Sequence, residues 1–391
     1  MNKDKNFQLT QSKSFCMLPW LHIHTTPVGR IMPCCVADMD IKANSLRHAF
    51  NSKEMKQLRL DMLSDVQNPA CNACYSMDPY TETSRKHHNK LFAHRFDELV
   101  PQTNSDGSLN TFKLHYYDIR FSNICNMKCR MCNSDYSSQW AKETSSPISY
   151  GNDFYLVEIL ERIDDLELAY FAGGEPLITE QHYTILEQLI RKNKNIPLVY
   201  STNASVLKYK NKDLLELWKH FSKIELRVSM DHYGNKAEYI RHGSKWDVVE
   251  SNILKFKELD NVNLALLSVV NIYNYLTLPE IHKYILEKNL LKNTSNWILF
   301  KMNHPNHLTT LVLPKHLKEF ANNHITNYVN SLGDEHSHVK SQLLSCITYT
   351  ESDDQFDTHK EKFIEEVRKL DSLRNEDCTQ TFPELASIFN G

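Results

Sequence analysis

The stretch SNICNMKCRMCNSDY, Ser122 to Tyr136, holds three cysteines, Cys125, Cys129 and Cys132, at spacings of three and two intervening residues. Most protein metal sites use four ligands, so a set of three leaves one coordination position for another molecule. No further cysteine follows within the next dozen residues. A zinc site, or a cluster held by protein alone, would therefore need a distant fourth ligand, whereas an open site would bind a small molecule.

The whole-chain composition limits the classes of protein to consider. The length of 391 residues allows two or three domains with large cores, so folding needs no disulfide bonds. The formal net charge of -3 gives no basic field of the kind that indicates a nucleic-acid partner. No signal-peptide core and no run of about 18 apolar residues occurs, so we expect a cytoplasmic protein without membrane association. In that compartment the ten cysteines indicate metal ligands rather than disulfides.

Short apolar segments alternate with amphipathic segments on both sides of the opening stretch. The apolar segments predict strands at 114–122, 166–172, 197–202, 224–230, 264–270 and 296–302. The segments between them predict helices at 152–166, 181–193, 213–221, 246–259 and 277–289. This alternation indicates a parallel sheet with crossover helices, either a partial (β/α) barrel or an open doubly wound sheet. In both folds the chemistry lies in loops after the strands, and the three cysteines follow the first strand.

The cysteine spacing resembles the signature of the radical S-adenosylmethionine (SAM) enzymes, C-x3-C-x2-C in the loop after the first strand of a (β/α)6 partial barrel. The resemblance implies that Cys125, Cys129 and Cys132 hold a [4Fe-4S] cluster whose fourth iron binds SAM.

Further motifs follow the predicted strands in the order typical of this family. FAGGEPLI matches the GGEP motif that holds the amino group of SAM, STNAS the polar end of the third strand, and RVSMD the ribose-facing residues after the fourth. Taken singly, each also suits a turn, a cap or a surface charge, but their order favours the family. The resemblance implies cofactor contacts at Gly173, Gly174, Glu175, Pro176, Ser201, Asn203, Ser229, Asp231 and Arg241, the last near the cofactor carboxylate.

Five more cysteines precede the predicted barrel. PWLHIHTTPVGRIMPCC alternates like a hairpin around 27–29, which would bring Cys16 and Cys34 near each other. Cys71 and Cys74 form a ligand pair by their spacing. Four thiolates suit zinc as well as iron-sulfur, so the residues alone leave both metals open.

This N-terminal pattern resembles the auxiliary-cluster domain called SPASM, or its shortened form, twitch. In most relatives that domain follows the barrel, whereas here it precedes the barrel. The resemblance implies a second, closed [4Fe-4S] cluster with the ligands Cys16, Cys34, Cys71 and Cys74. Cys35 is adjacent to Cys34, but the Gly-x4-Cys spacing from Gly29 favours Cys34.

Two other polar groups precede the barrel. His22 and His24 share one face of the expected hairpin, and we expect that face to be solvated rather than to bind metal. The most basic run, 84–95, suits a phosphate or an acidic peptide, but a solvated helix face is the preferred interpretation.

The expected architecture is α/β with three parts. A twitch/SPASM-like auxiliary cluster domain spans 1–112, a radical SAM partial barrel spans 113–313, and a helical C-terminal extension spans 314–391. The leucine and phenylalanine spacing of the extension indicates a helix that packs onto one of the other two domains.

The resemblance also implies a reaction. SAM would be cleaved reductively to methionine and a 5′-deoxyadenosyl radical, which takes a hydrogen atom from the substrate. We expect an oxidoreductase that carries out a two-electron oxidation of a small or locally presented substrate, with an electron donor such as flavodoxin or ferredoxin. A peptide-modifying, maturase-type enzyme is the alternative. The hypothesis from another class is a non-enzymatic zinc-binding protein in which all the cysteines are structural.

Overall fold

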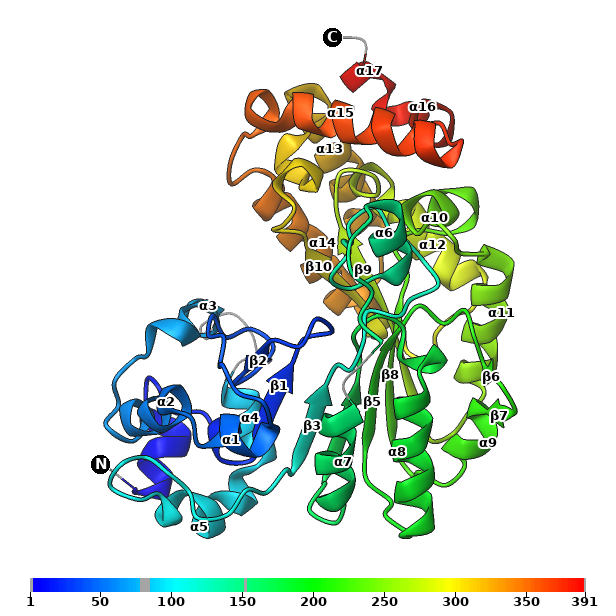
Figure 1. Ribbon diagram of the computed structural model, residues 1–391. Coiled ribbons are helices and arrows are strands. Elements are labelled where there is room, and N and C mark those ends of the chain that lie inside the picture. The colour runs from blue at the N-terminus through cyan, green and yellow to red at the C-terminus, as the bar shows by residue number, and fades with distance from the viewer. Residues whose placement is uncertain (1–2, 78–84, 151–152, 390–391) are drawn as a thin grey trace. The chain divides into compact units, whose positions relative to one another are not determined.

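The computed structural model describes residues 3–77, 85–150 and 153–389 (Figure 1). The chain forms two compact units. The first contains Met1–Cys125, Ser134–Val199 and Lys208–Lys223, and the second contains Asn126–Asn133, Tyr200–Leu207 and Ile224–Gly391.

The N-terminal part of the first unit is organised around a short hairpin. Strand β1 (His22–Thr25) pairs antiparallel with β2 (Ile31–Met32), which confirms the hairpin predicted around 27–29. On its other side β1 pairs in parallel with β3 (Tyr116–Ile119), a pairing that the sequence did not indicate. Strand β1 therefore has a partner on both sides, and its side chains are buried.

Short helices surround this hairpin. Serine side chains cap two of them, since Ser45 Oγ accepts the backbone N–H of His48 and Ser52 Oγ that of Met55. The bounds are α1 Leu46–Phe50, α2 Lys53–Leu63, α3 Asn72–Met77, α4 Arg85–Leu91 and α5 Phe96–Leu99.

Helix α4 carries most of the predicted basic run, of which Ser84 lies outside the described residues. The expectation of a solvated face is wrong for Arg85 and Asn89, which are buried. The Arg85 guanidinium donates to the carbonyl oxygens of Ser12 and Phe15, and the Asn89 amide also donates to Phe15. These side chains therefore hold the N-terminal segment in place.

The rest of the first unit repeats strand and helix. Strand β3 pairs in parallel with β4 (Leu168–Phe171), and the order of strands in this unit is β5-β4-β3-β1-β2. Helices α7 and α8 lie side by side along these strands (Figure 1). The remaining elements are α6 Ser138–Glu143, α7 Asp153–Glu161, α8 Glu180–Arg191, β5 Leu198–Thr202, whose last residues belong to the second unit, β6 Lys208–Tyr209, β7 Lys212–Asp213 and α9 Leu214–Trp218.

The second unit continues the same pattern with three parallel strands. Strand β9 pairs in parallel with both β8 and β10, and every second residue of β9 is buried. The elements are β8 Ile224–Ser229, α10 Gly234–Ile240, α11 Trp246–Lys257, β9 Val262–Val270, α12 Leu278–Glu287 and β10 Trp297–Lys301. The predicted alternation of strands and helices is thus confirmed.

The C-terminal extension is helical, as predicted. Gln342 on α14 covers the edge strand β10, because its side chain accepts the N–H of Leu299 and donates to the carbonyl of Trp297. This pairing satisfies backbone groups that an edge strand leaves open. The helices are α13 Lys315–Ser331, α14 Ser337–Thr350, α15 Phe356–Arg374, α16 Cys378–Thr381 and α17 Ala386–Phe389.

Within the second unit, Arg130 connects the cysteine stretch to the extension. Its side chain is fully buried, with Nη2 2.5 Å from Asp371 Oδ1 and 2.6 Å from Glu376 Oε2. The guanidinium also lies 3.5 Å from the ring centroid of Tyr239, in a cation–π contact. The residue after Cys129 is therefore anchored by helix α15 and the turn that follows it.

Replacing Arg130 with glutamine should lower the free energy of unfolding of the chain by about 3 kcal/mol, near the low end for a broken buried ion pair, since Asp371 and Glu376 keep some solvent contact. Chemical denaturation followed by circular dichroism measures this change. The matched control is Lys245→Gln, because the Lys245 ammonium is largely exposed and 3.8 Å from Glu238. The control should change by less than about 0.5 kcal/mol. Equal losses in both variants would contradict the anchoring role.

Candidate cluster and cofactor sites

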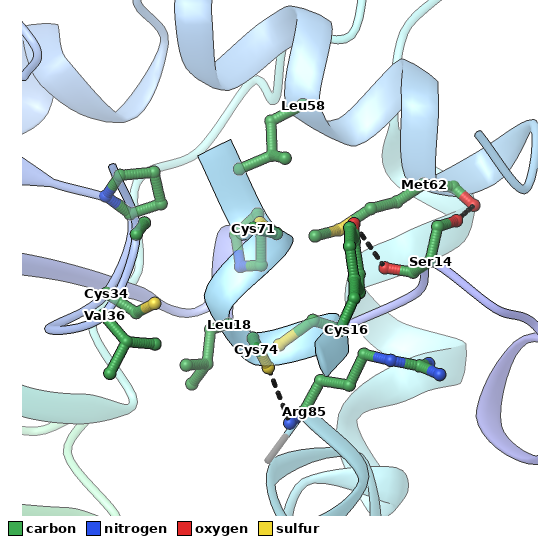
Figure 2. A pocket seen from close by; sticks show the side chains of 14 residues that line it. Ser14, Cys16, Leu18, Cys34, Val36, Leu58, Met62, Cys71, Cys74 and Arg85 are labelled. Atoms are coloured by element: carbon green, nitrogen blue, oxygen red, sulfur yellow. Dashed lines mark hydrogen bonds between the residues drawn. The ribbon is translucent and has the colours of Figure 1, made fainter. Parts of the chain in front are cut away.

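The four N-terminal cysteines predicted to bind metal meet in one pocket of the first unit (Figure 2). Cys16 precedes a 3-10 helix at Leu18–Trp20, and Cys34 follows β2. Cys71 and Cys74 lie where a second 3-10 helix passes into α3.

The chemistry of this pocket suits an iron-sulfur cluster. Its other walls are mainly apolar, with Leu18, Val36, Leu58 and Met62 among them (Figure 2). The backbone N–H of Arg85 donates to Cys74 Sγ at 3.4 Å, the kind of contact that tunes a cluster sulfur.

Burial keeps the thiols of this pocket protonated in the absence of metal. It raises the pKa of Cys71 to about 11, and it raises the pKa values of Cys16 and Cys34 as well. A bound metal is then what stabilises the thiolates, so cluster binding releases protons. Cys34 lines the pocket, whereas Cys35 is exposed and is not among the lining residues.

The GGEP turn of the first unit packs on the backbone that leads into Cys125. The backbone N–H of Glu175 donates to the carbonyl of Ile124 at 2.7 Å. A Cβ built at Gly174 would collide with that same carbonyl, so only glycine fits at this close approach. Gly173 has a φ of +127°, a backbone conformation that side chains rarely adopt. The two glycines therefore bring the turn against the segment before the first cysteine.

Glu175 and Pro176 have local structural roles as well as their predicted ones. Glu175 is buried, and its Oε1 accepts the N–H of Leu177, which caps the 3-10 helix Pro176–Ile178. Pro176 occupies the first position of that helix, where proline is favoured. Contact of the Glu175 carboxylate with the amino group of SAM stays a prediction.

Cys129 and Cys132 lie in the second unit, where Arg241 contacts the first of them. Arg241 Nη1 is 3.8 Å from Cys129 Sγ, and Arg241 Nη2 is 2.7 Å from Asp231 Oδ2. Asp231 is buried and also accepts the N–H of Val269. The sequence predicted that Asp231 faces the ribose and Arg241 the carboxylate of SAM, and the structure pairs the two side chains with each other.

In the second unit, side chains at the polar end of β5 form hydrogen bonds with Asn126 of the cysteine stretch. Asn203 Nδ2 donates to Asn126 Oδ1 at 3.0 Å, and Asn126 Nδ2 donates to Ser205 Oγ at 2.9 Å. Ser201 and Ser229 are half-buried at the ends of β5 and β8. Asn203 follows β5, whereas Ser201 and Ser229 belong to the last residues of their strands, and the contacts of all three with SAM stay predictions.

The sequence did not indicate several residues that support the cysteines. Ser138 in the first unit has its Oγ 3.2 Å from the N–H of Cys125 and 3.1 Å from its carbonyl oxygen. Asn126 and Arg130 make the contacts described above within the second unit. In the sequence, these three residues were marked only by their position between or near the cysteines.

One expectation about the hairpin is wrong. His22 and His24 do share a face, but each is about 1% exposed instead of solvated. Side chains of the neighbouring strand β3 contribute to this burial, because the Tyr116 ring stacks on His22 and Asp118 Oδ2 lies 3.1 Å from His24 Nδ1.

Comparison with known proteins identifies the two parts of the chain. A family model of the radical SAM superfamily matches residues 119–286, and a model of SPASM, an iron-sulfur cluster-binding domain, matches residues 16–75. The chain contains a SPASM domain that is followed in the sequence by a radical SAM domain. The radical SAM domain binds a [4Fe-4S] cluster and SAM, and the SPASM domain binds an iron-sulfur cluster, as predicted. The mostly parallel α/β sheet fits the predicted radical SAM partial barrel.

Individual similar proteins cover parts of this radical SAM chain. It is 28% identical to GTP 3′,8-cyclase of Campylobacter lari over 102 residues, which are 26% of this chain and 31% of the relative. The match thus spans about a third of the length of that relative. The solved structure of native anSMEcpe with bound AdoMet has 20% identity and a TM-score of 0.38, covering 54% of this chain and 59% of that chain. The solved structure of Streptococcus suis SuiB bound to precursor peptide SuiA has 16% identity and a TM-score of 0.36, and the match covers 70% of this chain and 63% of that chain.

Within the described ranges, no helix combines the length and the apolar character that a membrane-spanning segment requires.

Replacing Gly174 with alanine should weaken SAM binding roughly ten- to hundredfold, because the added methyl group must displace the backbone before Cys125, and overpacking typically costs about 1–3 kcal/mol. Equilibrium dialysis with labelled SAM measures the affinity, and iron analysis shows whether the cluster is retained. Gly234→Asn is the matched control, since Gly234 has open space around it and asparagine tolerates its positive φ. Unchanged affinity in Gly174→Ala would show that the close approach is not needed.

Proposed function

We propose that this chain is a radical SAM oxidoreductase that carries out a two-electron oxidation of a small or locally presented substrate. When bound at the [4Fe-4S] cluster, SAM supplies a 5′-deoxyadenosyl radical that takes a hydrogen atom from the substrate. Removal of a proton and one further electron then completes the oxidation. A small electron-transfer protein such as flavodoxin or ferredoxin would supply the electron that starts each turnover.

Cys125, Cys129 and Cys132 are the proposed cluster ligands, which leave one iron open for SAM. Burial raises the pKa of the Cys129 thiol, and the Arg241 guanidinium 3.8 Å from the sulfur opposes that rise because it favours the thiolate. The glycine pair of the GGEP turn supports the proposed site, because it lets the turn pack closely against the backbone before Cys125.

The observation that favours oxidation is the pocket with four cysteines. Four thiolates give every iron of an auxiliary cluster a protein ligand, which leaves no position for substrate. Electron transfer is the function that suits such a closed cluster. A substrate radical formed by loss of a hydrogen atom needs an electron acceptor to become an oxidised product, and the auxiliary cluster supplies one.

Turnover with deuterated candidate substrates tests this proposal. The protein is reconstituted anaerobically with iron and sulfide, then incubated with SAM, a reductant and either small alcohols and sugars or peptides. Deuterium in 5′-deoxyadenosine identifies the substrate that loses hydrogen, and a product lighter by two hydrogens identifies oxidation. If deuterium is transferred from peptides alone, the substrate is a peptide, and the maturase-type alternative replaces the proposal of a small substrate. A colourless protein that binds zinc and no iron would exclude both.

Cys129→Ala should abolish SAM cleavage while the protein stays folded, because the change removes a loop ligand and not a core side chain. Liquid chromatography of 5′-deoxyadenosine measures cleavage, and circular dichroism measures folding. Cys346→Ala is the control, since Cys346 is buried in α14 away from both sets of cysteines in the sequence. Normal 5′-deoxyadenosine production by Cys129→Ala would refute the radical SAM assignment of this cysteine.

Replacing Cys71 and Cys74 together with alanine should lower the iron content from about eight to about four per chain, the stoichiometry of one four-iron cluster. SAM cleavage with an artificial reductant should persist, because the radical SAM cluster remains. Substrate oxidation should fall further than cleavage, since the electron acceptor is lost. Iron analysis and product quantification measure the two effects. About four irons plus zinc in the unaltered protein would contradict an auxiliary iron-sulfur cluster.

A further inference from the structure

Two buried histidines of the first unit lie outside the cysteine pocket. The side chains of His22 and His24 lie on the same face of β1. In the register of the two strands, these residues are opposite Tyr116 and Asp118 of β3. Both rings are about 1% exposed. Neither histidine lines the pocket formed by Cys16 and the other three cysteines.

The hydrogen bonds of the two rings fix their tautomers in the same way. His22 Nδ1 lies 2.9 Å from the carbonyl oxygen of Tyr116, and His24 Nδ1 lies 2.9 Å from that of Asp118. A carbonyl oxygen only accepts, so each Nδ1 carries the proton and each Nε2 of the neutral ring has a bare lone pair. Within residues 3–77, 85–150 and 153–389, neither Nε2 makes a hydrogen bond.

A carboxylate completes the group. Asp118 is buried, with Oδ2 3.1 Å from His24 Nδ1 and Oδ1 3.2 Å from Arg120 Nε. One ligand atom from each of His22, His24 and Asp118 lies within 4.8 Å of the others. A carboxylate has about four lone-pair sites, so Asp118 keeps both of these neighbours and still has lone pairs for a metal.

The protonation states of the group suit metal binding. Burial lowers the pKa of His22 to about 3, which keeps its ring neutral. Burial alone would raise the pKa of Asp118, but the charge of Arg120 and the neighbouring His24 hold it below its usual range. Metal ligands must be deprotonated, and these shifts favour that form of His22 and Asp118.

We propose that His22, His24 and Asp118 bind one divalent transition-metal ion through the two Nε2 atoms and the carboxylate. Two imidazoles and one carboxylate are typical ligands of Zn²⁺ and of non-haem Fe²⁺, and three protein ligands leave coordination positions open. The Nδ1 bonds to backbone carbonyls are the contacts that orient metal-binding histidines.

This metal site is independent of the proposed oxidation. Its nitrogen and oxygen ligands differ from the thiolates of both clusters, so the metal is counted separately from cluster iron. The three residues belong to β1 and β3 of the first unit, and none of them is a proposed ligand of SAM or of a cluster.

Equilibrium dialysis of the reconstituted protein against micromolar Zn²⁺, followed by elemental analysis, tests the proposal. We expect one zinc per chain with the iron content unchanged. His22→Gln with His24→Gln should lose that zinc and keep its iron, and Asp118→Asn should bind it at least about tenfold more weakly. The control is His115→Gln, which alters a buried histidine of the same region that contacts Glu167. Zinc retained by the double variant, or zinc gained only as iron is lost, would overturn the proposal.

X-ray absorption of the zinc-loaded unaltered protein gives an answer even where the variants fail to fold. We expect nitrogen and oxygen neighbours at about 2.0–2.1 Å with the scattering pattern of imidazole. Sulfur neighbours at about 2.3 Å would place the zinc at cysteines and exclude the proposed site. Absence of bound zinc in the unaltered protein would also exclude it.

Discussion

The parallel pairing of β1 with β3 is the constraint on which the first unit depends. It joins the hairpin of the SPASM domain to the first strand of the radical SAM domain, with His22 opposite Tyr116 and His24 opposite Asp118. Because β2 pairs with the other edge, β1 has no open edge, and its side chains are buried. The same hairpin leads to Cys34 in the cysteine pocket, so the hairpin that holds the buried histidines also carries one proposed ligand of the auxiliary cluster. A strand pairing therefore links the SPASM domain to the start of the radical SAM domain.

Features with a local physical cause could be predicted from the sequence. Alternating apolar residues and helical periodicity located the strands and helices, since these patterns depend on neighbours a few residues apart. The spacing of Cys125, Cys129 and Cys132 and the GGEP turn indicated the chemistry through their resemblance to the radical SAM family. The hairpin that brings Cys16 and Cys34 into one pocket was also predictable from its turn residues.

Features that depend on distant partners could not be predicted. The alternation of His22 and His24 showed that they share a face, but the strand that covers it comes 94 residues later. Arg130 looked like a loop residue, and its carboxylate partners lie 241 and 246 residues away in the extension. The basic run was interpreted by composition, which does not show that Arg85 points inward to carbonyls near the N-terminus. Burial of a charged or titratable side chain depends on tertiary contacts, which a single sequence does not display.

The first unit keeps two kinds of metal ligand apart by their chemistry. The cysteine pocket has soft sulfur ligands whose burial favours the protonated thiol, so only a strongly bound, thiophilic metal stabilises the thiolates. The histidine and aspartate group has nitrogen and oxygen ligands, and the pKa shifts of His22 and Asp118 favour their deprotonated forms before metal binds. Selectivity among divalent metals in proteins follows ligand type more than affinity alone. Separate pockets with different ligand types therefore allow an iron-sulfur cluster and a second metal to form in one domain without competing for the same ligands.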